Sequence, residues 1–252
     1  DSVRNIDSAA INDAGIGGYT LMTRAGAAAL SAIRTHFPDA KRWQVICGSG
    51  NNGGDGYVVA RLAAEQGIAV SVLAVSPAEK LSGDAATAHM DFAALGGAVA
   101  PYDGSLDDAA DLLVDGLLGS GLERNVEGTY AEVVNAVNAH DAPVVALDIP
   151  SGLHGDSGAI MGVAVRADLT VTFVGLKSGL YLDSGPEFTG DIVFADLDIP
   201  AECRAAQAPI MRRIDDRILR QALSAMEERL AAAWASRTEA CPLANDYEAL
   251  IL

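Results

Sequence analysis

Residues 48–57 read Gly-Ser-Gly-Asn-Asn-Gly-Gly-Asp-Gly-Tyr, a glycine-rich stretch between an apolar, strand-like segment at 43–47 and a helix-like segment at 57–64. A glycine-rich turn at the end of a strand lets backbone N–H groups approach a phosphate, and the N-terminus of the following helix adds partial positive charge. The first, third and sixth residues match the G-x-G-x-x-G spacing of dinucleotide-binding proteins. The stretch therefore indicates a strand–turn–helix unit with a site at its turn.

Two features depart from a standard dinucleotide-binding motif. Asp55 places a carboxylate beside the expected anion site, and the next strand-like segment, 70–75, is followed by Ser76 rather than by an acid that could bind a ribose. Asn51 and Asn52 also lie inside the stretch. This composition is more typical of a polar reaction site than of a simple phosphate-binding loop.

Length, charge and cysteine content exclude several classes of protein. The chain of 252 residues fits one α/β domain with an appendage, and its formal net charge of −17 disfavours nucleic acid and anionic membranes as partners. Three widely spaced cysteines without a C-x-x-C pair give neither a disulfide framework nor a zinc site. No signal peptide or membrane-spanning segment is visible, so we expect a cytoplasmic protein.

Apolar, strand-like segments alternate with helix-like segments along most of the chain. The strand-like segments are 45–47, 69–75, 112–114, 143–147, 169–173 and 192–194, with a short one from Val99, and the helix-like segments are 8–36 (one or two helices), 57–67, 83–95 and 129–139. Apolar runs without polar alternation, separated by helices, are typical of a parallel sheet covered on both faces. We therefore predict the α/β fold class.

The C-terminal segment, 209–252, differs in composition from the rest of the chain. It contains clustered arginines and apolar residues at helical spacing: Arg212, Arg213, Arg217, Arg220 and Arg229, with Ile214, Ile218, Leu219, Ala222 and Leu223. We predict a long terminal helix, followed by weak order from Pro242 onward. Such a helix could pack on the domain, mediate oligomerisation or link to a further domain.

Ionisable or amide side chains followed by glycine turns come directly after four predicted strands. They are Asn51, Asn52 and Asp55 after the first, Asp115 ahead of Gly119–Leu122, Asp148 ahead of Gly152, and Lys177 ahead of Gly179. Each set alone is ordinary turn chemistry. Because ligands of open parallel sheets bind at the carboxyl ends of the strands, the four sets together favour a functional site at this edge.

The residue types suggest distinct roles within that site. The oxygen atoms of Asn52, Asp115 and Ser151 are hard ligands that suit an alkali or alkaline-earth cation rather than zinc or copper. The alternative is that these side chains simply make hydrogen bonds to the nearby backbone. Asp148 directly follows a buried strand and is a candidate general acid or base. Lys177 could hold a phosphate or orient Asp148.

A second candidate phosphate-binding turn is Gly119–Gly121, with Arg124 and Asn125 nearby to supply charge and hydrogen bonds. A hydrolase with a Ser-His-Asp triad is disfavoured. Ser151 lies outside a G-x-S-x-G motif, and the four histidines are scattered, with only His154 near the end of a strand.

Five runs of this sequence, at 21–26, 47–61, 114–122, 145–153 and 172–179, together resemble the NAD(P)H-hydrate epimerases. The resemblance covers residues 5–200, and its most specific parts are Asn-Asn-Gly-Gly-Asp-Gly and Leu-Asp-Ile-Pro-Ser-Gly. It implies a Rossmann-like three-layer α/β/α sandwich with a mostly parallel central sheet, usually a homodimer. It also implies an activity that interconverts the R and S epimers of hydrated NADH and NADPH and uses a bound potassium ion.

The resemblance carries over to individual positions of this chain. It implies that Asn52, Asp115 and Ser151 bind the potassium ion. It implies substrate contacts from Asn51, Asn52, Gly53, Gly54, Asp55, Gly119, Ser120, Gly121, Leu122, Glu123, Arg124, Asn125, Tyr130 and Asp148, with Lys177 at a position that the family usually keeps as lysine. For the dimer, the apolar face near Leu21 and Met22 is a candidate interface.

The chemistry of this substrate requires one proton-transfer group. The reacting carbon carries a hydroxyl and neighbours a ring nitrogen, and no carbonyl acidifies its C–H bond. Either the nitrogen lone pair expels the hydroxyl and the flat iminium accepts water on either face, or the ring opens to an aldehyde and closes again. Both routes need a proton donor and acceptor beside the hydroxyl, and we assign this role to Asp148.

In many bacteria an epimerase domain of this kind is fused to a dehydratase, and residues 212–219 resemble the start of that connection. The glycine-rich body of a dehydratase does not follow. We predict an epimerase domain over 1–208 and a helical extension or linker remnant over 209–252, without a dehydratase domain. Two alternatives are a catalytically silent dimeric scaffold of the same fold, disfavoured by retained acids such as Asp148, and an NAD(P)-dependent oxidoreductase, disfavoured by the missing ribose acid.

Overall fold

The computed structural model describes residues 2–205 and 216–240 of the chain. The chain divides into two compact units, Asp1–Ala208 and Pro209–Leu252. In the second unit the described residues form one helix, α8 (Asp216–Ala240), where the sequence pattern predicts a long helix. The prediction of weak order from Pro242 onward lies outside the described residues.

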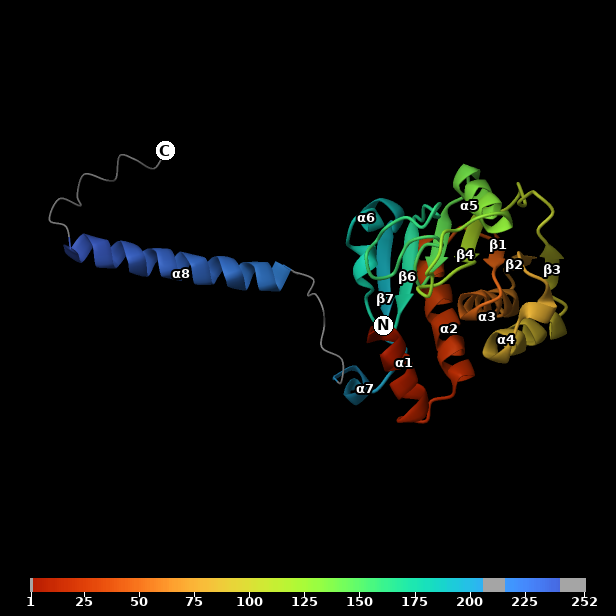
Figure 1. The fold of residues 1–252 in the computed structure, drawn as a ribbon, viewed down its shortest axis with the longest axis horizontal. Helices are drawn as coiled ribbons and strands as arrows, with labels where there is room; N and C mark the ends of the chain where they lie inside the picture. Colours follow the sequence, from red (N-terminus) through yellow and green to blue (C-terminus); the bar gives the residue numbers. More distant parts are fainter. Residues whose placement is uncertain (1, 206–215, 241–252) are drawn as a thin grey trace. The chain divides into compact units, whose positions relative to one another are not determined.

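The first unit contains one sheet of seven parallel strands in the order β3-β2-β1-β4-β5-β6-β7 (Figure 1). The strands are β1 (Arg42–Cys47), β2 (Ala69–Ala74), β3 (Ala98–Pro101), β4 (Leu112–Gly116), β5 (Val144–Leu147), β6 (Leu169–Phe173) and β7 (Asp191–Ala195). The chain builds outward from β1 to β3 and then in the opposite direction from β4 to β7. This order places the topological switch point, where doubly wound folds bind ligands, between β1 and β4.

Helices and loops bury both faces of the sheet. The helices of this unit are α1 (Ser2–Asn12), α2 (Gly18–His36), α3 (Asn51–Glu65), α4 (Gly83–Ala94), α5 (Thr129–Ala139), α6 (Gly185–Phe188) and α7 (Ala201–Ala205). Helices α1 to α4 pack with Val45 and Cys47 on one face, and α5 packs with Ile46 on the other. Successive strand residues alternate between faces, so β1 contributes to both cores. The predicted α/β/α sandwich with a parallel sheet is confirmed.

Helix α3 begins at Asn51, inside the glycine-rich stretch, and not at residue 57 as the sequence pattern predicts. The glycines of its first turns are sites of close packing. A Cβ on Gly53 would overlap the carbonyl oxygen of Gly48, and a Cβ on Gly54 would lie 2.6 Å from Met22 Cε. Glycine lowers helix propensity, but here it permits contacts that any side chain would block.

Residues 8–36, predicted as one or two helices, form two, because the chain turns between α1 and α2 at Gly15 with a φ of 67°. That value lies in the left-handed region, which glycine adopts without steric cost. The turn lets α1 and α2 lie side by side on the same face of the sheet (Figure 1).

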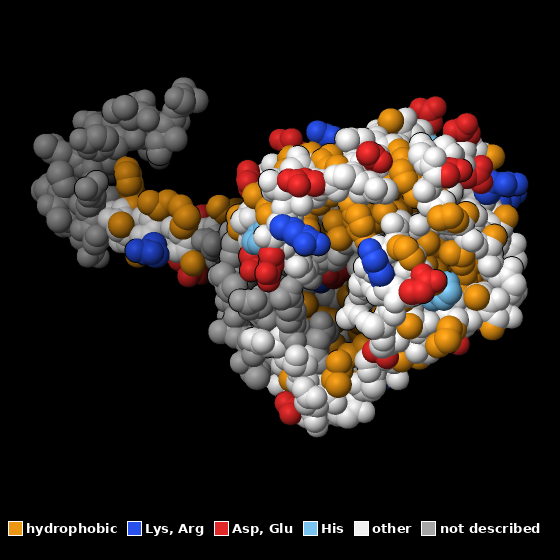
Figure 2. All heavy atoms as spheres, turned by 45° about the vertical axis from the view of Figure 1, so that its right-hand side comes forward, with side chains coloured by type: hydrophobic (Ala, Val, Ile, Leu, Met, Phe, Trp, Pro, Cys, Tyr) orange, Lys and Arg blue, Asp and Glu red, His pale blue; other side chains and the backbone are white. Residues whose placement is uncertain are grey.

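The surface reflects the acidic composition of the chain. Figure 2 shows acidic side chains spread over the visible face, with lysine and arginine side chains dispersed among them. Nucleic-acid phosphates require clustered basic residues, and this face offers no such cluster. Within residues 2–205 and 216–240, no helix combines the length and apolar character that crossing a membrane would require.

Candidate functional site

A cleft of about 940 Å³ opens at the carboxyl edge of the sheet, at the switch point between β1 and β4. Most of the predicted substrate-binding residues line it: Asn51, Asn52, Asp55, Gly119, Ser120, Gly121, Leu122, Glu123, Arg124, Tyr130, Asp148 and Lys177. Gly53 and Gly54 lie beneath it in the first turn of α3, and Asn125 is exposed outside it. The strand ends that the sequence pattern singles out therefore converge on one cleft.

The turn between β1 and α3 approaches the turn after β4 too closely for any side chain. A Cβ on Gly48 would overlap the carbonyl oxygen of Leu117, and a Cβ on Gly119 would lie 3.3 Å from Asn52 Cβ. The N-cap residue of α3, Gly50, makes no side-chain capping hydrogen bond. Because the first N–H groups of a helix lack intrahelical partners, the start of α3 can bind an anion such as a phosphate.

Asp115, Ser151 and Asn52 form a connected oxygen-rich cluster behind the cleft. Ser151 donates to the Asp115 carboxylate through its backbone N–H (2.8 Å) and its hydroxyl (2.6 Å), and the Leu117 N–H donates to the same carboxylate at 3.1 Å. The Leu118 N–H donates to Ser151 Oγ at 2.8 Å, and Asn52 Nδ2 donates to the Leu118 carbonyl at 2.9 Å. The cluster joins the ends of β4 and β5 to the first turn of α3.

One atom of this cluster is buried without a partner, namely the side-chain oxygen of Asn52. A buried carbonyl oxygen without a hydrogen bond costs about 1–3 kcal/mol. A cation bound against Asn52 Oδ1 would remove that cost, and its charge would offset the buried Asp115 carboxylate. The predicted potassium ligands Asn52, Asp115 and Ser151 therefore fit such an ion. The described residues contain no group of three or more His, Cys, Asp or Glu able to hold a metal.

Burial dominates the electrostatics of this cluster. Loss of solvent raises the pKa of Asp115 to about 6 from its usual 3.8, partly countered by the hydrogen bonds from Ser151 and Leu117. Burial likewise raises the pKa of the Cys47 thiol well above its ordinary value, and the charges of Asp115 and Asp55 add to the effect. Cys47 therefore stays protonated and belongs to the core, as the sequence pattern suggests.

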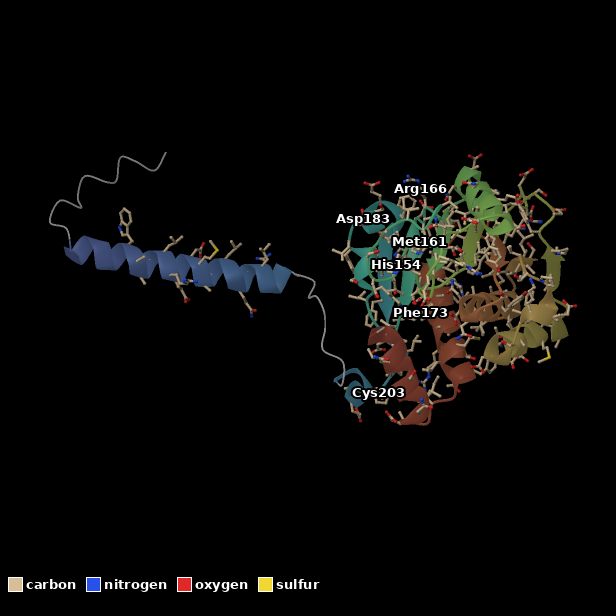
Figure 3. The ribbon with its side chains drawn as sticks, in the orientation of Figure 1. His154, Met161, Arg166, Phe173, Asp183 and Cys203 are labelled. Carbon is tan, nitrogen blue, oxygen red and sulfur yellow. The ribbon has the colours of Figure 1, made fainter. Side chains whose placement is uncertain are left out.

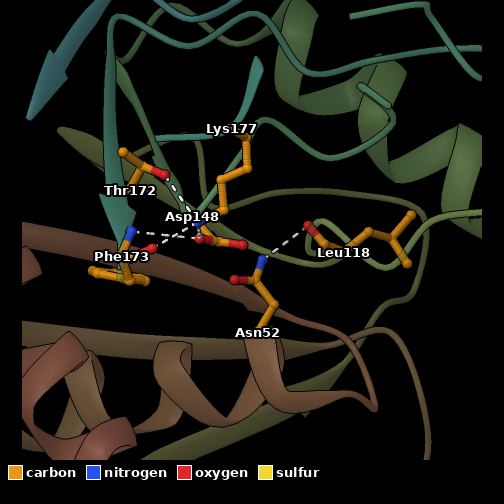
Figure 4. A network of polar contacts seen from close by, with 6 residues as sticks. All are labelled: Asn52, Leu118, Asp148, Thr172, Phe173 and Lys177. Atoms are coloured by element: carbon orange, nitrogen blue, oxygen red, sulfur yellow. Dashed lines mark hydrogen bonds and ion pairs between the residues drawn. The ribbon is translucent and has the colours of Figure 1, made fainter. Parts of the chain in front are cut away.

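Asp148 and Lys177 meet at the end of β5 and β6, at the wall of the cleft. Asp148 has a φ of 67°, and its side chain is 16% exposed against 4% for that of Lys177. Lys177 Nζ donates to Asp148 Oδ1, to the Phe173 carbonyl at 2.8 Å and to Thr172 Oγ1 at 3.0 Å (Figure 4). The carboxylate is thus held in one orientation by a buried ammonium.

The structure adds an apolar wall to the cleft, which the sequence pattern did not predict. The cleft has an apolar wall formed by Ile11, Leu21, Met22, Ala25, Phe173, Val174 and Leu197, and Asp84 lies at its edge. Leu21 and Met22 are each only 6% exposed and line the cleft, so these two side chains offer little surface to a second copy of the chain, and the dimer interface near them stays a prediction. Their helical spacing marks a buried face, but spacing alone cannot show whether that face meets a neighbour or a ligand.

Two further hydroxyl and imidazole groups are explained by local contacts. The Tyr130 hydroxyl, at the cleft, shares a hydrogen bond of 2.8 Å with Ser76 Oγ. Ser76, which occupies the position of the ribose-binding acid of dinucleotide-binding proteins, therefore supports Tyr130. His154 (Figure 3) contacts Ser157 Oγ at 2.9 Å and accepts from the Ser157 N–H at 3.2 Å. These bonds close the loop after β5 and give His154 a structural role.

The raised pKa of Asp115 predicts a pH-dependent stability. The folded protein holds this proton more tightly than the unfolded chain, so the stabilisation is complete below the unfolded pKa of about 3.8 and is lost as the pH rises through about 6. We expect the unfolding free energy of the wild-type protein to fall with pH relative to Asp115→Asn, by an amount on the order of 3 kcal/mol over the full shift. Urea unfolding of both proteins in potassium-free buffer, from about pH 3.5 to 7, measures this. Parallel pH curves would contradict the assignment.

Comparisons with known proteins find a matching family and named relatives of this chain. The sequence profile of the family described as YjeF-related protein N-terminus matches residues 18–179. The chain is 45% identical over 196 residues to the NAD(P)H-hydrate epimerase of Limosilactobacillus fermentum, covering 77% of this chain and 93% of that protein. It is 40% identical over 212 residues to the bifunctional NAD(P)H-hydrate repair enzyme Nnr of Escherichia coli, covering 84% of this chain but 41% of that enzyme.

The crystal structure of yeast YNL200c has the same fold, with a TM-score of 0.68 and 21% identity, over 84% of this chain and 93% of that one. The chain thus spans nearly the whole of the Limosilactobacillus fermentum epimerase and about two fifths of the bifunctional enzyme. Sequence identity, profile and fold together lead to one conclusion: the chain belongs to the family of NAD(P)H-hydrate epimerases, through the domain known as the YjeF-related N-terminus.

Proposed function

We propose that this protein interconverts the R and S epimers of hydrated NADH and NADPH, a repair reaction of nicotinamide nucleotides. The observation that carries the proposal is Asp148, whose carboxylate lies at the wall of a nucleotide-sized cleft and is fixed there by Lys177. Family membership supports the reaction class. Because the match covers only two fifths of the bifunctional relative, we propose the epimerase reaction alone.

The two glycine turns supply the contacts that a dinucleotide requires. The uncapped start of α3 offers N–H groups to the pyrophosphate, and the Gly119–Arg124 segment faces it across the cleft with the guanidinium of Arg124. The apolar wall from α2 and β6 provides a surface for a ring. Such a cleft combines polar groups for orientation with apolar surface for binding energy.

Asp148 carries the proton that either route of epimerisation needs. As an acid it protonates the departing hydroxyl, and as a carboxylate it accepts a proton from the water that adds to the iminium. In the ring-opening route the same group takes and returns the hydroxyl proton. Its place at the end of β5, directly after a buried strand, sets the carboxylate against the ligand and away from bulk water.

Asn52, Asp115 and Ser151 would hold the potassium ion. When bound, it supplies positive charge that offsets Asp115 and fixes the turns on which the nucleotide rests. The free Asn52 oxygen and the buried Asp115 carboxylate support this proposal. The homodimer and the cytoplasmic location that we expect from the sequence stay predictions.

The proposed reaction predicts a specific outcome with a mixture of epimers. An S-specific dehydratase alone consumes only the S fraction of hydrated NADH. We expect this protein to convert the R fraction, so that the mixture is consumed completely and faster than spontaneous epimerisation allows. Absorbance of the regenerated NADH measures it. Consumption that stops at the S fraction would favour a silent scaffold or an oxidoreductase.

Replacing Asp148 with Asn tests the proton-transfer role. The amide keeps the shape of the side chain but cannot exchange the proton, so we expect turnover to fall by at least about 10²-fold. The same coupled assay measures it, and Asp39→Asn, the same change at an exposed position outside the cleft, is the surface control. Near-normal turnover of Asp148→Asn would make Asp148 a binding residue only.

Replacing potassium with lithium tests the cation. Lithium is smaller and more strongly hydrated, so it should not satisfy ligands spaced for potassium, and we expect slower epimerisation or weaker substrate affinity. Kinetics in buffers of equal ionic strength measure the effect, with Asn52→Ala as the matched variant that should lose the cation response. Equal activity in both salts would remove the cation from the proposal.

A further inference from the structure

Lys177 is an unusual residue for a nucleotide cleft because its ammonium is already fully engaged. The residue is 5% exposed. A lysine ammonium has three N–H donors, and Nζ makes three contacts: Asp148 Oδ1, Thr172 Oγ1 at 3.0 Å and the Phe173 carbonyl at 2.8 Å. Each donor therefore has an acceptor within the protein, and none is directed at a ligand.

The acceptors of Lys177 lie on the strands and not on the glycine turns. Thr172 and Phe173 form the end of β6, and Asp148 directly follows β5, which pairs with β6 in the sheet. The side chain turns back from the loop after β6 to reach them (Figure 4). Lys177 thus joins two strand ends, whereas a lysine that binds the phosphates would point toward α3.

The carboxylate of Asp148 is held asymmetrically. Every hydrogen bond that the described residues make to it goes to Oδ1, from Lys177 Nζ and, at 3.5 Å, from the Phe173 N–H. The backbone of Asp148 is also constrained, with a φ of 67° and its N–H donated to the Val171 carbonyl at 2.8 Å. Oδ1 is therefore committed to the protein, and Oδ2 is the oxygen available to a ligand.

We propose that Lys177 is a positioning residue for epimerisation: it holds Oδ1 of Asp148 so that Oδ2 alone meets the substrate hydroxyl, and it does not bind the phosphates. This inference rests on the proposed function. In the iminium route, Asp148 gives its proton to the hydroxyl, the C–O bond breaks and water leaves as the ring nitrogen lone pair forms the C=N bond. Water then adds at the carbon, the lone pair returns to nitrogen and the proton returns to Asp148.

Lys177 gives no proton to the substrate in this sequence, and its contacts to Asp148, Thr172 and Phe173 hold the carboxylate while Asp148 exchanges the proton. The phosphates must then be met by another cation. Of the residues that line the cleft, Arg124 is the other lysine or arginine, and it is exposed. Arg124 lies in the segment after β4 that faces α3, so it can contact a pyrophosphate without leaving a carboxylate unpaired.

The two roles separate in steady-state kinetics. A residue that orients the proton-transfer group acts on kcat, whereas a residue that binds the phosphates acts mainly on KM. In the assay coupled to excess S-specific dehydratase, we expect Lys177→Met to lose about 10²-fold in kcat with KM changed by less than about threefold. We expect the matched variant Arg124→Met to raise KM about tenfold with kcat nearly unchanged.

A second variant protects the test against simple misfolding of Lys177→Met. Thr172→Val keeps the lysine and the shape of the side chain but removes one of its acceptors, and Thr172 is buried outside the cleft lining. We expect kcat about tenfold lower with unchanged KM. Thermal unfolding and NADH binding of both variants check that the fold and the cleft persist.

An increase in KM at constant kcat for Lys177→Met would overturn the inference and assign the lysine to the phosphates. Normal kinetics of a folded Thr172→Val variant would overturn it as well, whether or not Lys177→Met folds. Failure of the wild-type protein to epimerise is a different result, because it refutes the proposed function itself.

Discussion

The buried Asp115 carboxylate is the constraint on which this site depends. It accepts hydrogen bonds from Ser151 and Leu117, and through Leu118 the same chain of bonds reaches Asn52 on α3. Three segments distant in sequence are thereby joined at the switch point of the sheet. In a buried setting, a lost partner leaves a polar group without water to replace it, so each bond stabilises the arrangement of the others.

Two carboxylates at one edge of the sheet are compensated in different ways. Asp115 is 1% exposed and is met by hydrogen-bond donors and, in our proposal, by a potassium ion. Asp148 lies at the cleft and is met by a lysine on one oxygen only. Their surroundings thus give the two carboxylates different roles: Asp115 organises the turns, and Asp148 can exchange a proton with a ligand. Other enzymes with two carboxylates in one site assign different roles to them in the same way.

Much of the fold follows from local patterns in the chain. Unbroken apolar runs such as Leu112–Val114 require burial on both faces, and the intervening helix-like segments supply the cover, so a parallel sheet is predictable. The early start of α3 is not, because glycine is read as a turn residue unless one knows that Gly53 packs against Gly48. Close approach of distant backbone segments leaves no periodic signal.

The polar residues of the site could be predicted from the sequence, whereas its apolar wall could not. Side chains that end strands, such as Asp115 and Asp148, are marked by position, and the family resemblance names their roles. Leu21 and Met22 have the spacing of any buried helix face, which is why an interface and a cleft wall look alike in sequence. Lys177 reaches its three acceptors because the chain turns back in the loop after β6, and no spacing rule describes that turn.

The close approach of Gly48 to Leu117 has a consequence for how this scaffold can change. At Gly48 and Gly53, on either side of the start of α3, there is no room for a side chain, whereas Gly121, Glu123 and Arg124 on the opposite wall are exposed. One wall of the cleft is therefore a rigid template and the other is free to vary. Laboratory evolution toward other nucleotides should accumulate its accepted substitutions on the variable wall.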